Sequence, residues 1–185
     1  DFGIYLPLLK KLQQDSFFEM EIIAFGTHLS HFHGYTLKAI LSENFNVPHQ
    51  IESLVLGDSQ ESVATAMGLT TLKFASFWNA VHGNYDLVFC LGDRYEMFSA
   101  VSAGIPYNIK FAHLHGGEET AGAIDDVFRH CISLSAKLHF CSTPVYEQRL
   151  RQLLNTDKNI CTVGALSLDN LASMELYSKE DFLKE

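Results

Sequence analysis

The stretch DLVFCLG, residues 86–92, decides the fold class of this chain. Its consecutive apolar side chains, bounded by Asp and Gly, are typical of a parallel strand that is covered by helices on both faces. A helical pattern over residues 95–103 follows almost at once. The stretch therefore predicts one strand–helix unit of a parallel α/β sheet.

The same alternation runs along the rest of the chain. Five further runs are rich in strand-forming residues: 19–25, 50–56, 109–115, 137–143 and 159–165. Helical patterns lie beside them, over residues 4–14, 34–43, 62–81, 124–134 and 144–154. Alternation at this spacing predicts an α/β fold with a doubly wound, mostly parallel, Rossmann-like sheet.

The predicted strands all fall within one lobe, residues 1–168. The pattern opens on a helix, whereas a doubly wound sheet usually starts with a strand, so we expect the first strand to be missing. Residues 169–185 are polar and helical, without another strand. They predict a linker or exit helix towards an absent second lobe.

The composition is that of a globular protein. Of the 185 residues, 47% are hydrophobic and 19% charged, and 13 basic against 22 acidic side chains give a formal net charge of −9. This balance argues against a nucleic-acid partner, because phosphate binding needs clustered Lys and Arg. No apolar stretch approaches the ~20 residues of a membrane-spanning helix. Four cysteines without a CxxC pair fit reduced thiols, so we expect a cytoplasmic protein.

Polar residues and glycines follow several predicted strands, at the edge where ligands bind in open α/β sheets. Asp93 has two possible roles, as a cap of the next helix or as an acid or base in the strand-end cleft. Gly116 and Gly117 predict a turn that passes close to another group. His28 lies in the histidine-rich stretch GTHLSHFHG, residues 26–34, which predicts a loop that contacts a ligand or partner.

Further titratable side chains are expected at the same cleft. His113 and His115 lie two apart on a strand and so share one face. They form either a metal pair or one structural and one site histidine, and we predict no metal site because no third ligand is evident. Asp125 and Asp126 begin a helix, where they either favour its dipole, with Asp126 pairing with its i,i+3 neighbour Arg129, or join the cleft. Converging carboxylates push their pKa values apart, which favours a catalytic cluster of Asp93, His115, Glu118, Asp125 and Asp126, with Arg129 and His130 beside it.

Several common reaction classes lack their motifs. The chain contains no GxGxxG, GxxxxGK[ST] or GxSxG pattern. Nicotinamide-dependent hydride transfer, P-loop phosphoryl transfer and serine hydrolysis are therefore poorly supported. The residues alone leave open a metal-dependent phosphoesterase and a non-catalytic binding module beside a metal-free enzyme.

Four stretches together closely resemble one family, the UDP-N-acetylglucosamine 2-epimerases. They are GDRYEM (residues 92–97), HLHGGEETAGAIDD (113–126), RH (129–130) and VGALSLDNL (163–171). The opening DFGIYLPLLKKL looks like the end of the family's first-strand motif, whose preceding Gly-Thr-Arg-Ala is absent. The motifs are similar to those of the hydrolysing, sialic-acid-pathway branch. The resemblance implies the amino-terminal lobe of a two-lobed, glycosyltransferase-B-like fold with the active site between the lobes.

The resemblance also implies an activity. Hydrolysing members convert UDP-N-acetylglucosamine by eliminating UDP to give a 2-acetamidoglucal, and water addition then gives N-acetylmannosamine. Relatives with the same motifs act on a 2,4-diacetamido-trideoxy UDP-sugar. This scheme needs no metal or redox cofactor. Members usually form homo-oligomers, for which helix 62–81 is a possible contact face, and this chain alone is expected to be inactive because half the cleft is missing.

Site residues carry over from the family position by position. Asp93 matches a catalytic Asp, and Asp125 with Asp126 matches a paired acidic site. Some members have Glu where His115 stands, so either His115 or Glu118 does the acid–base work. The residues expected to bind substrate are His28, Arg94, Gly116, Gly117, Arg129 and His130.

Overall fold

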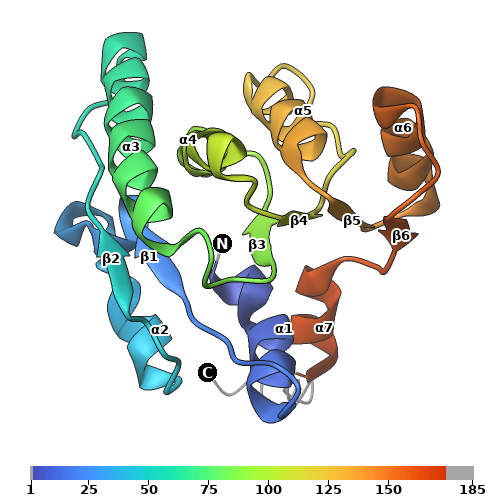
Figure 1. Ribbon diagram of the computed structural model, residues 1–185, viewed down its shortest axis with the longest axis horizontal. Helices are drawn as coiled ribbons and strands as arrows, with labels where there is room; N and C mark the ends of the chain where they lie inside the picture. The colour runs from blue at the N-terminus through green and yellow to red at the C-terminus, as the bar shows by residue number, and fades with distance from the viewer. Residues whose placement is uncertain (1, 174–185) are drawn as a thin grey trace, which may run out of the picture.

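The structure, a computed structural model, describes residues 2–173 (Figure 1). The strands are β1 (Ile23–Phe25), β2 (His49–Ile51), β3 (Val88–Leu91), β4 (Phe111–Leu114), β5 (Leu138–Cys141) and β6 (Ile160–Thr162). The helices are α1 (Phe2–Gln14), α2 (Leu37–Ser42), α3 (Gln60–Val81), α4 (Tyr95–Gly104), α5 (Asp125–Ser135), α6 (Pro144–Leu154) and α7 (Leu166–Ser173). Three 3₁₀ turns join them: η1 (Gly26–Leu29), η2 (His31–His33) and η3 (Ile105–Tyr107). The predicted alternation of strands and helices is confirmed.

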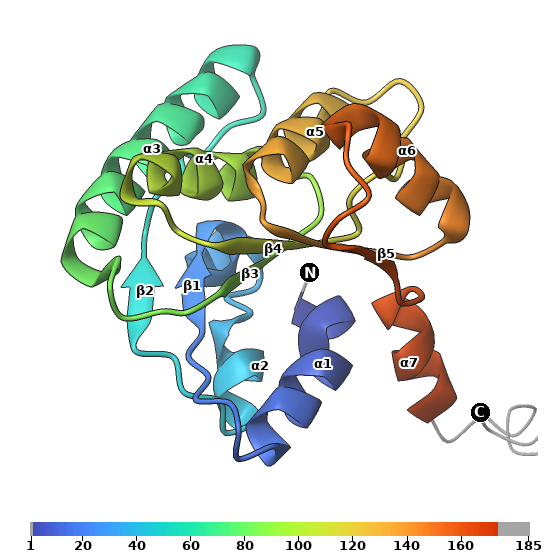
Figure 2. The ribbon, with the colours of Figure 1, turned by 45° about the vertical axis from the view of Figure 1, so that its right-hand side comes forward.

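The strands pair in parallel but form two sheets. One sheet holds β1 and β2, and the other holds four strands in the order β3-β4-β5-β6. Figure 2 shows α3 to α6 on one side of the larger sheet and α1 with α7 on the other. Helices on both faces confirm the predicted doubly wound, mostly parallel α/β fold.

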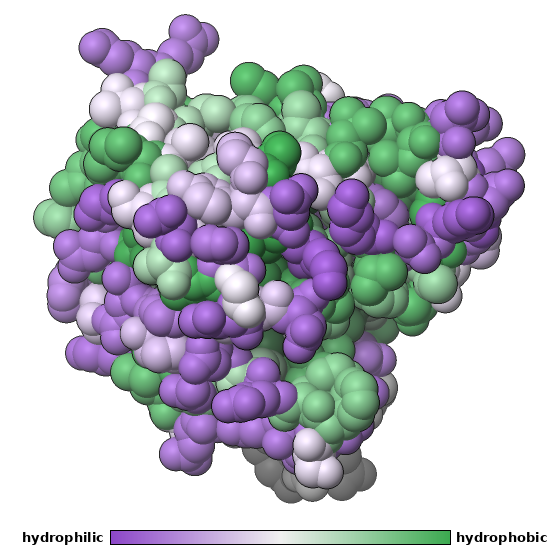
Figure 3. Space-filling view, viewed as in Figure 1, coloured by the Kyte–Doolittle hydropathy of each residue, from purple (hydrophilic) through white to green (hydrophobic). Residues whose placement is uncertain are grey.

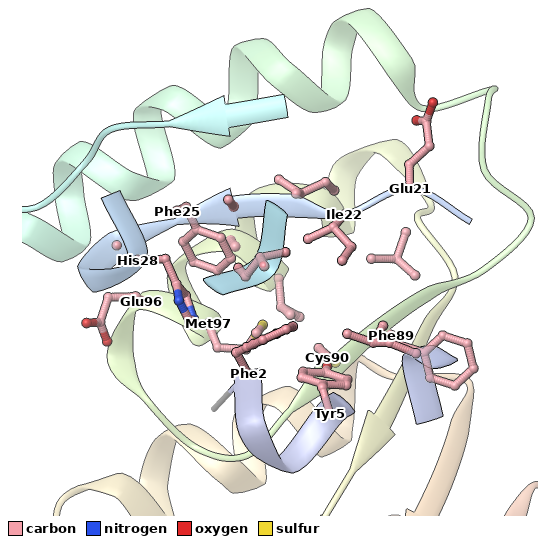
Figure 4. Close-up of a pocket in the computed structure, with 18 of the residues that line it drawn as sticks. Phe2, Tyr5, Glu21, Ile22, Phe25, His28, Phe89, Cys90, Glu96 and Met97 are labelled. Carbon is pink, nitrogen blue, oxygen red and sulfur yellow. The ribbon is translucent and has the colours of Figure 1, made fainter. Parts of the chain in front are cut away.

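An apolar cavity of about 220 Å³ lies where β1 and β3 face each other (Figure 4). Phe2 and Tyr5 of α1 point into it, together with Phe25 of β1 and Cys90 of β3. Burial here raises the pKa of the Tyr5 hydroxyl well above its usual value. Within the described residues no ladder of backbone hydrogen bonds joins β1 to β3. The missing first strand stays a prediction.

Some element boundaries differ from those expected. The strands are shorter than the apolar runs, and the predicted helix over residues 34–43 begins only at Leu37. The histidine-rich stretch before it forms the turns η1 and η2. Gly26, which begins η1, and Gly34, which follows η2, have positive φ angles of 61° and 84°. Helix α7 begins before residue 169 and packs against α1. The rest of the predicted exit helix, residues 174–185, lies outside the described residues.

The main core lies between α3, α4 and the larger sheet. Trp78 of α3 is 1% exposed, and its indole N–H donates to the carbonyl oxygen of Ala100 in α4 (2.9 Å). Phe74 packs edge-on against Phe25, with ring centroids 4.9 Å apart, and so ties β1 to this core. Because α4 is fixed by this packing, the short connection from β3 into α4 is held in place.

Apolar side chains also reach the outer surface over α5 and α6 (Figure 3). Val127 and Leu134 of α5, and Ile124 just before it, are each more than half exposed. Helix α3, the predicted oligomer contact, exposes only one large apolar side chain, Leu72. Core packing therefore accounts for most of the apolar residues of α3. No helix between residues 2 and 173 combines the length and apolarity needed to cross a membrane.

Candidate active site

The carboxyl ends of β3, β4 and β5 meet at one edge of the larger sheet. The backbone N–H of Gly92 donates to the carbonyl oxygen of Leu114 (3.1 Å), and that of His115 to the carbonyl oxygen of Phe140 (2.9 Å). These bonds continue the ladder one residue past the strands. The segments that begin with Asp93 and His115 therefore leave the sheet side by side, as the sequence predicts.

Arg129 of α5 joins the acidic side chains at this edge. The side chain is 5% exposed and donates to the carboxylates of Asp93 and Asp126. It also donates to the carbonyl oxygen of Glu118 (2.8 Å) and to Thr120 Oγ1 (3.0 Å). A buried guanidinium needs such partners, because burying an unpaired charge is costly. One cation therefore holds together two carboxylates from different parts of the chain.

A second cluster lies beside it and is centred on Glu118. His115 Nδ1 lies 2.7 Å from Glu118 Oε1, and Ser142 Oγ donates to the same oxygen at 2.5 Å. Burial disfavours the charged carboxylate, but the hydrogen bonds from His115 and Ser142 outweigh it and lower the pKa of Glu118. Because its pKa is lowered, Glu118 is ionised at neutral pH. Its partner His115 has a φ of 63°, an uncommon conformation for a residue other than glycine.

The two glycines after His115 pack against the protein itself. A Cβ on Gly116 would lie 3.0 Å from His113 Nδ1, and one on Gly117 would lie 2.4 Å from the carbonyl oxygen of Tyr146. Gly117 also has a φ of 79°. The close approach predicted for this turn is thus to side chains of β4 and α5 and to α6. Binding of substrate by these glycines stays a prediction.

His113 is the structural member of the predicted histidine pair. It is fully buried, its Nε2–H donates to the carbonyl oxygen of Gly92 (2.8 Å), and its Nδ1 accepts from Ser133 Oγ (2.9 Å). Burial lowers its pKa to about 4, so the imidazole is neutral at pH 7. Among the described residues, no group of three or more His, Cys, Asp or Glu side chains could hold a metal ion.

Asp125 and His130 lie near the cluster without joining its hydrogen bonds. Both are half-buried on α5. The hydrogen bonds that Arg94 donates to Glu96 are the main cause that raises the pKa of Arg94, and the charge of Asp125 adds a smaller contribution. Of the predicted acidic pair, only Asp126 contacts Arg129.

Arg94 and His28 lie at a neighbouring hollow, which Thr27, Thr36 and Phe2 also line. Arg94 is half-exposed and donates to both carboxylate oxygens of the buried Glu96, at 2.8 and 3.1 Å. His28 Nδ1 lies 2.7 Å from Thr36 Oγ1, and burial is the main cause that lowers its pKa. No hydrogen bond of the described residues links either side chain to Arg129.

Sequence reasoning missed three residues of the site. Ser142 follows β5 just as Asp93 follows β3, so its position at a strand end was the available signal. Thr120 bonds Arg129 from within a loop, and Glu96 pairs with Arg94 from the first turn of α4. Nothing in the sequence around Thr120 or Glu96 predicts that either side chain bonds an arginine.

The chain is similar to known proteins along most of its length. The sequence model of the family described as UDP-N-acetylglucosamine 2-epimerase matches residues 10–185. A Campylobacter jejuni protein named GDP/UDP-N,N'-diacetylbacillosamine 2-epimerase (hydrolyzing) is 38% identical over 96% of this chain and 45% of its own length. A Legionella pneumophila UDP-N,N'-diacetylbacillosamine 2-epimerase (hydrolyzing) is 32% identical over 98% of this chain and 48% of its own length.

Solved structures share the fold. The crystal structure of a UDP-GlcNAc 2-epimerase from Neisseria meningitidis bound to UDP-GlcNAc superposes with a TM-score of 0.74 at 17% identity, over 92% of this chain and 45% of that one. The chain thus spans about half the length of the relatives it matches. The fold is one lobe of the two-lobed, glycosyltransferase-B-like architecture.

Proposed function

Because the chain belongs to the UDP-N-acetylglucosamine 2-epimerase family, we propose that it is the amino-terminal lobe of a hydrolysing UDP-sugar 2-epimerase. One observation carries the proposal: Arg129 gathers Asp93 and Asp126 beside Glu118 at the carboxyl ends of the strands. The names of the two hydrolysing relatives support this type of reaction.

The proposed reaction has two stages. The bond between carbon 1 and the UDP oxygen breaks, carbon 2 loses its proton, and the electron pair of the broken C–H bond forms the double bond of a 2-acetamidoglucal. Water then adds at carbon 1 while carbon 2 regains a proton on the opposite face. Positive charge develops on the ring as UDP leaves, and preorganised carboxylates stabilise such charge. Asp93 and Asp126 are suited to this, since Arg129 fixes both.

Two sugars fit this chemistry. One is UDP-N-acetylglucosamine, which would give N-acetylmannosamine and UDP. The other is a 2,4-diacetamido-trideoxy UDP-sugar, favoured by the names of the relatives at 38% and 32% identity. Both carry the 2-acetamido group and the UDP leaving group that the elimination requires. The half-exposed Arg94 and His28 are proposed to contact the substrate from the neighbouring hollow.

The test is an NMR time course of the complete two-lobed protein in D₂O with each sugar in turn. We expect free UDP and a 2-epimeric sugar deuterated at carbon 2. Asp93→Asn should lower the rate by at least about 100-fold, the usual scale for a group acting directly on the transition state. Asp157→Asn, at an exposed carboxylate, is the matched control. Residues 1–185 alone should release no UDP.

Either of two outcomes would refute the proposal. One is that neither sugar releases UDP with the complete protein. The other is that Asp93→Asn and Asp157→Asn react at the same rate as the unchanged protein. Production of a UDP-linked epimer without free UDP would show a non-hydrolysing enzyme instead.

A further inference from the structure

We propose that Glu118 is the residue that takes the proton from carbon 2, and that His115 and Ser142 are positioning residues that aim its carboxylate. This inference rests on the proposed function and decides between the two acid–base candidates, His115 and Glu118. It also gives a role to Ser142, which stands at the end of β5.

The two oxygens of Glu118 have different surroundings. Oε1 accepts from Ser142 Oγ at 2.5 Å and lies 2.7 Å from His115 Nδ1, so both donors hold the same atom. Oε2 takes part in no hydrogen bond among the described residues, and the side chain is 27% exposed. A carboxylate fixed through one oxygen presents the other in a defined direction. Preorganisation of this kind is what a general base requires.

His115 is badly placed to exchange a proton with a ligand. Its Nδ1 is occupied, because the ionised carboxylate of Glu118 can only accept and the nitrogen must carry the hydrogen. The remaining nitrogen, Nε2, is buried and has no hydrogen-bond partner among the described residues. The backbone of His115, with a φ of 63°, places the ring in this position and is strained. Strained residues of this kind are frequent at functional sites.

Two basic side chains act on the Glu118 carboxyl, and both favour its ionised form. His115 contacts it from the end of β4, and the guanidinium of Arg129 on α5, which also donates to the Glu118 backbone oxygen, lowers its pKa as well. The Cys141 thiol of β5 is neutral, since burial raises its pKa to about 11. An ionised Glu118 can accept a proton but cannot supply one. In the elimination, UDP leaves with the electron pair of the C1–O bond, Oε2 forms the new O–H bond as the C2–H bond breaks, and the freed electron pair forms the double bond between carbons 1 and 2.

The experiment compares four variants of the complete protein by UDP release across pH. Glu118→Gln should lower kcat by at least about 100-fold. His115→Asn tolerates a positive φ and keeps an N–H near Oε1, so its kcat should stay within about tenfold of the unchanged protein. Ser142→Ala removes a donor to the carboxylate, which raises the pKa of Glu118. The acidic limb of kcat/KM should then move to higher pH by about one unit, and Ser142→Thr should restore it.

The control is Ser135→Ala, which removes a hydroxyl bonded only to a carbonyl within α5. Its pH profile should match that of the unchanged protein. Loss of activity in His115→Asn equal to that of Glu118→Gln would overturn the inference, and so would an unmoved acidic limb in Ser142→Ala. Titration of the Glu118 carboxyl carbon by ¹³C NMR needs no turnover. It therefore tests the positioning by Ser142 even if no UDP-sugar is converted and the proposed function fails.

Discussion

Gly117 illustrates how one residue shapes the site. Its carbonyl oxygen accepts from Arg149 (3.0 Å), and its Cα faces the backbone of Tyr146 at the start of α6. The turn that carries His115 and Glu118 is thereby clamped onto α6. Any side chain larger than hydrogen at position 117 would push this turn away, because the nearest atom belongs to the backbone.

Gly117→Ala should destabilise the chain far more than Gly122→Ala. Both glycines have a positive φ, 79° and 80°, so both variants pay about 1–2 kcal/mol for the left-handed conformation. Only Gly117 has a neighbour, 2.4 Å from the added Cβ, whereas nothing lies within 4 Å at Gly122. We expect at least about 3 kcal/mol for Gly117→Ala, because the backbone must shift. Urea unfolding of both variants measures this, and equal losses would contradict it.

At the scale of elements, β4 and β5 carry two buried histidines side by side. His113 pairs with His139 in the register of the two strands, and each is at most 4% exposed. Burial lowers the pKa of both imidazoles to about 4. The centre of the larger sheet therefore tolerates these residues only in their neutral form.

The free energy of unfolding should fall as the pH is lowered from 6.5 to 4. In the unfolded chain the two imidazoles take up protons near pH 6.5, whereas in the folded protein they stay neutral down to about pH 4. The unfolded state binds more protons in this window, so each histidine contributes a loss of about 3 kcal/mol across it. Urea unfolding at several pH values measures the slope. The slope counts the protons taken up on unfolding, and His113→Gln should lower that number by one. An unchanged slope would contradict this.

The sequence predicts the elements well but not their ends. Buried parallel strands need consecutive apolar residues, so runs such as 86–92 mark β3 and its neighbours without knowledge of the fold. The strand ends follow from the chain direction alone, which is why Asp93, His115 and Glu118 could be placed at one edge. The helix predicted over residues 34–43 begins only at Leu37, since Gly34 and Tyr35 have positive φ angles that no periodicity reveals.

The sequence predicts the partners within one helix but not those between elements. Asp126 and Arg129 lie three apart on α5, where helical spacing alone lets them pair, whereas the contact of Arg129 with Asp93 depends on how α5 packs beside the β3–α4 connection. Likewise, His113 and His115 have the same local setting, but β4 ends between them. His113 is therefore enclosed by α5, while His115 enters the loop and meets Glu118.

At the scale of the whole molecule, the larger sheet and its helices carry the candidate site, and the β1–β2 pair stands apart. Side chains connect the two parts: Phe25 packs on Phe74, and the Tyr85 hydroxyl donates to Glu21 (2.7 Å). Burial is the main cause that raises the pKa of Tyr85, and the hydrogen bond to Glu21 raises it further. Tyr85 therefore stays protonated and can donate.

Because the two sheets are separate, we expect the amide protons of β1–β2 and of β3–β6 to differ in their protection against hydrogen exchange. Opening of the β1–β2 pair breaks its own short ladder and these side-chain contacts but no backbone hydrogen bond of β3–β6, since none joins the two sheets within residues 2–173. Amide protons of β1 and β2 should therefore exchange through a partial opening, at a lower free energy than those of β4. Native-state exchange followed by NMR measures both. Equal protection would contradict this and would mean that the two sheets open together as one cooperative unit.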